Sequence, residues 1–170
     1  MNESTLFNGL LIGWFVLGAV VFVLLFFVAA PYGRHIRKGW GLTIDNRLAW
    51  VLMEAPSPVV FALCFILGGV TNAVSVAFLA LWEAHYLHRA FIYPFGLRGA
   101  DKRMPLAIMA FGFLFNIMNG YLNGRWLFTL SGGYDNSWLA DPRFIVGSTL
   151  FVIGFIINRQ ADIVLRGLRR

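Results

Sequence analysis

The residue most suggestive of chemistry is a carboxylate in an apolar stretch. Glu54 stands in Met53-Glu54-Ala55-Pro56-Ser57-Pro58, with apolar residues on both sides. In a membrane span, the cost of burying a carboxylate predicts that Glu54 faces a bundle interior and has a polar partner. Burial favours the neutral acid, which can donate a proton. The prolines interrupt the helix, and such backbone is tolerated at membrane depth only inside protein or beside a cavity. Alternatively, Glu54 lies near a membrane surface and is solvated.

A second group of polar residues lies between positions 82 and 89. On a helix, one face would carry Trp82, His85, Tyr86 and Arg89, flanked by Glu83 and His88. Tyr86 is a candidate proton or hydrogen-bond donor, especially if it is linked to a carboxyl group such as that of Glu54. Alternatively, the group anchors a helix at the membrane surface. Two histidines three residues apart, without a strong third ligand, predict no metal site.

Three amides follow at helical spacing. Asn116, Asn119 and Asn123 share one face of a predicted helix, and Tyr121 lies nearby. Amides at this spacing either join helices through hydrogen bonds or bind a polar ligand. The sequence leaves these two interpretations open.

A fourth group begins at Asn158 and continues through Asp162, Arg166 and Arg169, which can lie along one side of a helix. Asp162 and Arg166 also form an i,i+4 pair in the favourable order. Arginines combined with an acid and an amide suit a phosphate-bearing nucleotide. The chain has no GxGxxG motif and no P-loop, so a dinucleotide site here would not be a Rossmann domain.

The elements that must position these groups are membrane helices. The chain of 170 residues is 59% hydrophobic and 13% charged, whereas a soluble domain carries about a quarter charged residues. The apolar runs predict an all-α, polytopic transmembrane bundle forming a single domain over residues 1–170. About five spans are expected, at residues 6–30, 50–67, 72–93, 105–130 and 144–165.

The basic residues indicate orientation rather than nucleic-acid binding, despite a net charge of +6. When Arg125 and Arg159, near the ends of their spans, are counted with the segments that follow them, Lys and Arg number 0, 4, 0, 3, 2 and 4 in the successive segments between and beyond the spans. This alternation predicts an external N-terminus and a cytosolic C-terminus, in a bacterial inner membrane or an endoplasmic reticulum membrane. The single cysteine, Cys64, excludes an intrachain disulfide and a multi-cysteine metal site. Membrane lipid is an expected partner, and the oligomeric state is not determined by the sequence.

Four motifs, in order and with similar spacing over residues 50–170, resemble the steroid 5α-reductase family. Met53–Ser57 is similar to the family's Gln-Glu-x-Pro-Ser motif, and His85–Arg89 to its His-Tyr-x-His-Arg segment. Asn116–Leu122 resembles an Asn-rich segment that ends in Gly-Tyr. Gly154–Arg169 resembles a run of the form Gly-x-x-Ile-Asn…Asp…Leu-Arg-x-Leu-Arg.

This resemblance implies NADPH-dependent reduction of the Δ4 double bond of a 3-oxo steroid or a similar lipid enone. Hydride would go to C5 and a proton to C4. Glu54 and Tyr86 would hydrogen-bond the C3 carbonyl and stabilise the developing enolate. The implied cofactor-binding residues are Asn158, Asp162, Arg166 and Arg169, with Arg89, Arg98 and Arg103 as further candidates. The residues assigned to the substrate pocket are Trp50, Met53, Tyr93, Asn116 and Asn119.

The sequence departs from the family in two places. Met53 stands where the family usually has Gln, which removes a hydrogen-bonding group. The family is also expected to have seven spans, so a C-terminal portion with two spans and further cofactor residues is expected to be absent after Arg170. The alternatives are a related enoyl reductase, an isoprenylcysteine methyltransferase-like enzyme, or a non-enzymatic membrane module that binds lipid or packs with partners. The Glu54/Tyr86 pair argues against the methyltransferase.

Overall fold

The computed structural model describes residues 2–28, 41–96 and 102–168, and almost all of them are helical. Arg98 and Arg169, both predicted cofactor residues, lie outside these ranges. The α-helices are α1 (Glu3–Leu24), α2 (Asn46–Glu54), α3 (Pro56–Gly68), α4 (Ala73–Leu87), α5 (Leu106–Arg125) and α6 (Pro142–Leu168). The π-helical turns are η2 (His88–Ile92) and η4 (Trp126–Leu130), and the 3-10 turns are η3 (Tyr93–Gly96) and η5 (Asn136–Ala140).

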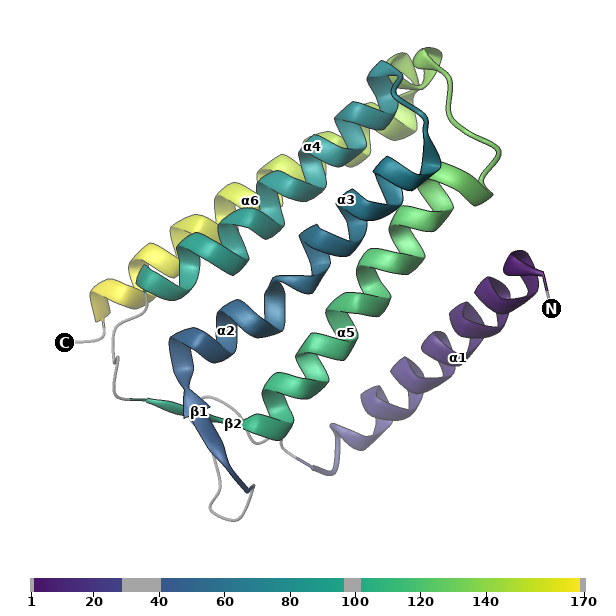
Figure 1. Cartoon of the computed structure of the whole chain (residues 1–170). Coiled ribbons are helices and arrows are strands. Elements are labelled where there is room, and N and C mark those ends of the chain that lie inside the picture. The colour runs from purple at the N-terminus through teal and green to yellow at the C-terminus, as the bar shows by residue number, and fades with distance from the viewer. Residues whose placement is uncertain (1, 29–40, 97–101, 169–170) are drawn as a thin grey trace.

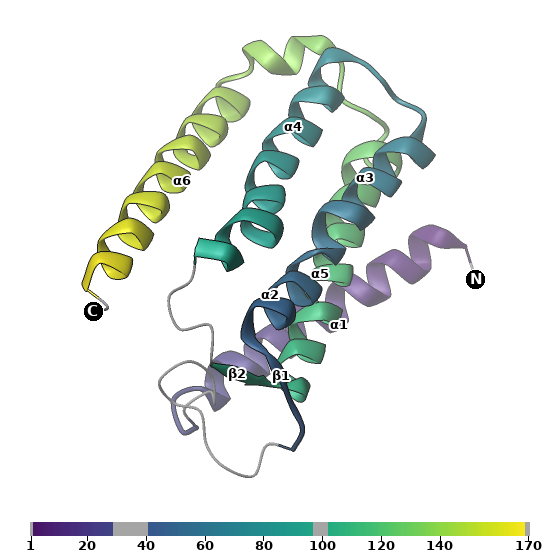
Figure 2. The same ribbon diagram turned by 60° about the vertical axis from the view of Figure 1, so that its left-hand side comes forward.

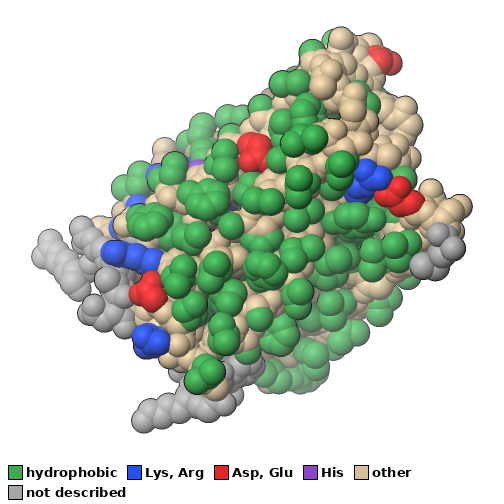
Figure 3. Space-filling model, viewed as in Figure 1, with side chains coloured by type: hydrophobic (Ala, Val, Ile, Leu, Met, Phe, Trp, Pro, Cys, Tyr) green, Lys and Arg blue, Asp and Glu red, His purple; other side chains and the backbone are tan. Residues whose placement is uncertain are grey.

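The helices lie side by side along one direction (Figures 1 and 2). The continuous pair α2–α3 lies between α4 and α5, with α1 beyond α5 and α6 beyond α4. The first and last described residues lie at opposite ends of the bundle (Figure 1). Hydrophobic side chains cover most of the face shown in Figure 3, and the charged side chains lie mainly toward its ends. This distribution is the one expected of a bundle surrounded by lipid.

Within the described residues, all five predicted spans are mainly helical. Four helices are long and apolar enough to cross a membrane: Glu3–Leu24, Asn46–Gly68, Leu106–Leu130 and Pro142–Leu168. The predicted span at residues 72–93 corresponds to α4, η2 and η3, which succeed one another without a break. It is less apolar than the other four because its second half carries one acid, two histidines and one arginine between residues 83 and 89. The described residues therefore form an all-α polytopic bundle.

Proline and capping residues determine where the helices in the middle of the bundle begin. Pro56 is the first residue of α3, which separates α3 from α2 and makes Glu54 the last residue of α2. Asn72 caps α4, since its side chain accepts a 2.9 Å hydrogen bond from the Ser75 amide. The Asn72 side chain also donates a 2.6 Å hydrogen bond to the Tyr134 carbonyl oxygen, which links the start of α4 to the segment before η5.

The tightest packing joins α3 and α5. Phe61, Cys64 and Phe128 are buried at the centre, and the Phe61 ring stacks on Trp82 with ring centroids 4.3 Å apart. Gly124 makes this packing possible, because a Cβ atom there would come within 2.7 Å of the Cys64 Cβ. Gly13 of α1 makes no comparable close contact, since a Cβ atom there would meet nothing within 4 Å.

A two-stranded antiparallel sheet that the sequence does not predict joins β1 (Thr43–Asp45) to β2 (Arg103–Pro105). It brings the start of α2 beside the start of α5. The Arg103 side chain reinforces it, donating hydrogen bonds of 2.8 Å to the Thr43 hydroxyl and 2.6 Å to the Thr43 carbonyl oxygen. In this structure Arg103, predicted to bind a cofactor, binds the neighbouring strand.

Candidate active site

Glu54 forms a buried ion pair. The residue is 5% exposed, and its Oε1 accepts a 2.9 Å hydrogen bond from Nε of Arg89. The prediction of a buried, partnered carboxylate is therefore confirmed. Only one carboxylate oxygen is engaged by Arg89.

Two aromatic rings hold Arg89 against Glu54. The Arg89 guanidinium lies 5.2 Å from the centroid of the Trp50 ring and 5.9 Å from that of Tyr93. The two rings contact each other edge to face, with centroids 5.4 Å apart. Cation–π attraction and the ion pair thus act on the same guanidinium. Trp50 and Tyr93, predicted for the substrate pocket, contact Arg89 here.

Asn116 joins α5 to the end of α2. Its buried side-chain amide donates hydrogen bonds to the carbonyl oxygens of Met53 at 2.9 Å and Gly112 at 3.1 Å. A longer contact of 3.4 Å reaches Oε2 of Glu54. For this residue the structure favours the interpretation that the amide connects helices.

Tyr86 lies on the neighbouring helix and is oriented by α5. Its hydroxyl oxygen accepts a 2.7 Å hydrogen bond from the side-chain amide of Asn119. Its ring packs against Trp82, with centroids 4.8 Å apart. The structure gives no hydrogen bond between Tyr86 and Glu54, but both contact α5: Tyr86 is hydrogen-bonded to Asn119, and Glu54 contacts Asn116 about one helical turn away. Tyr86 and Glu54 therefore border the same region without touching.

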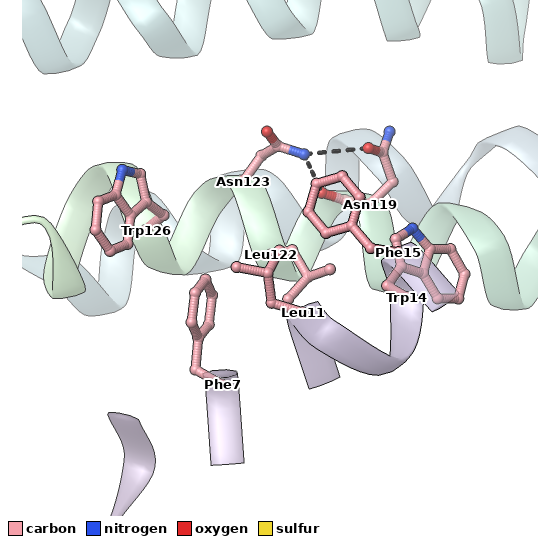
Figure 4. A pocket seen from close by; sticks show the side chains of 8 residues that line it. All are labelled: Phe7, Leu11, Trp14, Phe15, Asn119, Leu122, Asn123 and Trp126. Carbon is pink, nitrogen blue, oxygen red and sulfur yellow. Dashed lines mark hydrogen bonds between the residues drawn. The ribbon is translucent and has the colours of Figure 1, made fainter. Parts of the chain in front are cut away.

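A cavity of about 440 Å³ opens between α1 and α5. The residues that line it are Phe7, Leu11, Trp14, Phe15, Asn119, Leu122, Asn123 and Trp126. Figure 4 shows the aromatic side chains of α1 and the Asn123 amide, which points along α5 toward Asn119. Of the five residues predicted for the substrate pocket, Asn119 lines this cavity, Trp50, Tyr93 and Asn116 contact the ion pair, and the Met53 side chain lies against Gly112 of α5. The wall is apolar except at the two asparagines.

Helix α1 contributes half of that wall through few contacts. Phe7 is its one buried residue, and the Phe7 ring stacks on Trp126 with centroids 6.2 Å apart. At the same end, Nε of Arg125 donates a 2.8 Å hydrogen bond to Oε1 of Glu3. The sequence does not predict the role of α1, because residues 9–24 are all apolar or glycine and do not indicate which helix they face.

Polar groups from α4 and α6 meet at the end of the bundle where the described residues stop. A small cavity of about 10 Å³ is lined by His85, His88, Arg89, Tyr93, Phe155, Asn158 and Asp162. The Arg166 guanidinium lies 5.4 Å from the centroid of the Tyr93 ring and packs against Gly96. Four of the seven predicted cofactor residues thus lie in or beside one cluster. Arg166 forms no ion pair with Asp162 in the described structure, in contrast to the predicted i,i+4 pair.

Several hydrogen-bond donors in this cluster have no acceptor among the described residues. They are His88 Nε2, Arg159 Nη1, Arg166 Nε and Arg166 Nη2, all buried. Buried donors without acceptors are unfavourable unless a ligand supplies the acceptors. Arginine donors of this kind suit the oxygens of a phosphate group. No group of three or more potential metal-ligating side chains occurs in the described part of the chain.

The chain is similar to known membrane enzymes over most of its length. Residues 102–170 match the family described as 3-oxo-5-alpha-steroid 4-dehydrogenase. Steroid 5-alpha-reductase DET2 of Gossypium hirsutum is 36% identical over 99% of this chain and 67% of its own length. The 3-oxo-5-alpha-steroid 4-dehydrogenase 1 of Bos taurus is 39% identical over 91% of this chain and 61% of its own length. The human protein of the same name is 37% identical over 82% of this chain and 54% of its own length.

The chain thus spans between 54% and 67% of the length of these three relatives. The match includes the segments that carry the ion pair, the Tyr86–Asn119 contact and the polar cluster of α6. An all-α membrane bundle with these groups in its interior, together with this degree of identity, places the chain in the steroid 5α-reductase family.

Proposed function

We propose that the protein reduces the Δ4 double bond of 3-oxo steroids, or of similar lipid enones, with NADPH as the hydride donor. One observation carries the proposal. An apolar cavity between α1 and α5 has Asn119 in its wall, and Asn119 is hydrogen-bonded to Tyr86, which lies near the buried carboxyl group of Glu54. A lipid with a single polar carbonyl group fits such an arrangement.

The cavity supports the substrate class. Its volume of about 440 Å³ lies within the range of roughly 300–1,000 Å³ that small-molecule sites occupy. Rings of Phe7, Trp14, Phe15 and Trp126 offer flat apolar contact to a fused ring system. Because α1 is largely exposed toward the membrane, a substrate dissolved in lipid has a short route between α1 and α5.

The proposed reaction places negative charge on the carbonyl oxygen. Hydride, with two electrons, bonds to C5, the C4=C5 π electrons form a C3=C4 bond, and the electrons of the carbonyl π bond move to the C3 oxygen, which gives an enolate. The enolate then takes a proton at C4 and the carbonyl is restored. We assign Tyr86 as the hydroxyl donor to the developing oxyanion, since such donors supply a large part of catalysis when charge forms in a dry site.

Glu54 is proposed as the second donor. It has to carry a proton to donate one, and Arg89 engages only Oε1. Oε2 has a single long contact, 3.4 Å from the Asn116 amide nitrogen, so it is the oxygen left to face the substrate carbonyl.

The residues present fit the cofactor. The buried donors of His88, Arg159 and Arg166 that have no acceptor would hold phosphate oxygens. Asn158 and Asp162 would bind polar groups of the ribose or nicotinamide, with Arg89 and the undescribed Arg98 and Arg169 as further candidates. NADPH would supply the hydride. The same cluster supports the orientation predicted from the basic residues, with the C-terminal end of α6 in the cytosol where NADPH is present.

The test uses the full-length protein in membranes or nanodiscs, with NADPH and a 3-oxo-Δ4-steroid. We expect loss of the enone absorbance and a product heavier by two hydrogens. The E54Q/Y86F double variant is expected to be inactive. The matched control is Y134F, because the Tyr134 ring packs against Phe78 and Trp138 at the opposite end of α4. Full activity of E54Q/Y86F, or absence of NADPH binding by the wild type, would refute the proposal.

A further inference from the structure

A short chain of hydrogen bonds leads along α5 to Tyr86. The Asn123 side-chain nitrogen, Nδ2, donates to the backbone carbonyl oxygen of Asn119 at 2.9 Å and to the side-chain oxygen of Asn119 at 3.1 Å. The Asn119 side-chain nitrogen then donates to the Tyr86 hydroxyl oxygen at 2.7 Å. Figure 4 shows the two bonds between the asparagines.

The direction of this chain is set by its first member. A backbone carbonyl oxygen can only accept, so the end of the Asn123 amide that faces it has to be the nitrogen. That nitrogen also faces the Asn119 side chain, whose nearer end therefore has to be the oxygen. The far end of the Asn119 amide is then the nitrogen, and it faces Tyr86. A flipped Asn119 would set two donors against each other.

The orientation of Asn119 determines what Tyr86 can do. A phenol has one hydrogen to donate and an oxygen that can accept. Because the Asn119 nitrogen can only donate, the Tyr86 oxygen has to accept, and the Tyr86 hydrogen is left for another partner. Polar side chains near Tyr86 on its other sides include those of Ser57, Glu54 and Arg89, and the buried Ser57 hydroxyl has no hydrogen-bond partner among the described residues. Asn119 thus keeps the Tyr86 hydrogen available for a ligand rather than for α5.

We propose that Asn119, locked by Asn123, is a positioning residue that makes Tyr86 a hydrogen-bond donor to the substrate carbonyl. This inference rests on the proposed function. As the enolate forms, Tyr86 shares its proton with the carbonyl oxygen and its own oxygen gains negative charge. The Asn119 N–H stabilises that charge, and hydrogen bonds joined in one direction strengthen one another. Asn123 acts one step further away, through Asn119.

The decisive variant is N119D, which has nearly the same shape but presents an acceptor to Tyr86 when it is ionised. Tyr86 would then donate to Asp rather than to the substrate. We expect kcat for enone reduction to fall about tenfold to a hundredfold at neutral pH, less than the loss of a donor in direct contact with an oxyanion. The KM for NADPH is expected to stay unchanged. Activity should recover as the pH is lowered, because a protonated Asp can again donate to Tyr86. The matched control, N136D, adds the same charge in η5 and should keep the wild-type pH profile.

A second measurement does not depend on turnover. The carbonyl stretching frequency of a bound 3-oxo steroid, measured by infrared spectroscopy, is lowered by hydrogen bonds to that carbonyl. We expect a smaller lowering in N119L than in the wild type. N123L, which removes the lock but leaves Asn119 in place, should lose kcat by a few-fold. If N119D does not fold, these two variants decide the question.

The outcomes separate the two proposals. A wild type that reduces enones, with N119D equally active at every pH, would overturn the positioning role and leave the proposed function standing. A wild type that reduces no enone would overturn both. Recovery of N119D at low pH, together with the altered carbonyl frequency in N119L, would support the positioning role, because a merely structural contribution changes neither.

Discussion

Replacing Arg89 by methionine should destabilise the bundle more than replacing its partner Glu54 by glutamine. The Glu54 side chain is 7% exposed and that of Arg89 is 35% exposed. R89M would leave a carboxylate buried with one distant donor, and removing one partner of a buried pair costs about 3–5 kcal/mol. Because Arg89 is partly screened by solvent, the lower end of this range applies, about 3 kcal/mol.

E54Q leaves a cation instead of an anion, and that cation has other partners. The Arg89 guanidinium keeps its contacts with the Trp50 and Tyr93 rings and can reach solvent. We expect a cost of about 1 kcal/mol, the net loss of one hydrogen bond. For a chain of this size 1 kcal/mol corresponds to roughly 2–4 °C in unfolding temperature. The expected decreases are therefore about 6–12 °C for R89M and about 2–4 °C for E54Q.

The chain contains its own reporter for this measurement. Cys64 is the single cysteine and is 4% exposed, so a thiol-reactive fluorophore labels it only when the bundle opens. Heating each variant in detergent micelles with such a dye gives an apparent unfolding temperature. The double variant E54Q/R89M should be more stable than R89M alone, because no buried charge remains. Equal losses for the two single variants, or a double variant that shows their sum, would refute the reasoning.

Two further predictions concern packing and pH. G124A should lower the unfolding temperature, at a cost of about 1–3 kcal/mol, because its methyl group would press on Cys64; G13A, with open space around the same substitution, is the control and should be neutral or slightly stabilising. Asp141 has its pKa lowered from 3.8 to about 2, chiefly by hydrogen bonds from the side chain and backbone of Arg143. The ionised Asp141 therefore stabilises the fold above about pH 4, and this contribution should be lost as the pH falls from 4 to 2. Unfolding scans of the wild type should show this loss, whereas those of D141N should not. Identical pH profiles for the two proteins would contradict the assignment.

The interior placement of Glu54 could be predicted because a carboxylate in an apolar run has few favourable positions. The identity of its ion-pair partner could not be predicted. Arg89 is 35 positions away along the chain, and its orientation depends on a helix that widens just after Tyr86. The sequence predicts one shared face for His85, Tyr86 and Arg89, and in the structure their side chains contact different helices, although His85 and Arg89 both line the small cavity beside α6. His85 faces the α6 rings, Tyr86 faces α5, and Arg89 faces α2.

The asparagines show why a residue type alone leaves its role open. Asn116 connects helices, whereas Asn119 and Asn123, three and seven positions later, line the cavity. The two roles differ because Asn116 lies where α5 contacts α2, whereas Asn119 and Asn123 lie where α5 faces α1. The cavity itself could not be predicted, because half of its wall comes from α1, and apolar residues occur on every side of that helix.

The wide turn at His88–Ile92 has a consequence for how this chain can change in evolution. A π-helical turn accommodates one residue more than an α-helical turn over the same length. Removing a single residue there would restore an α-helix and rotate the residues after the turn by about 100° relative to those before it. Tyr86 would keep its place beside α5, but Tyr93 would leave the guanidinium groups of Arg89 and Arg166. Insertions and deletions in this turn should therefore be selected against, and we expect related sequences to keep a constant number of residues between Tyr86 and Tyr93.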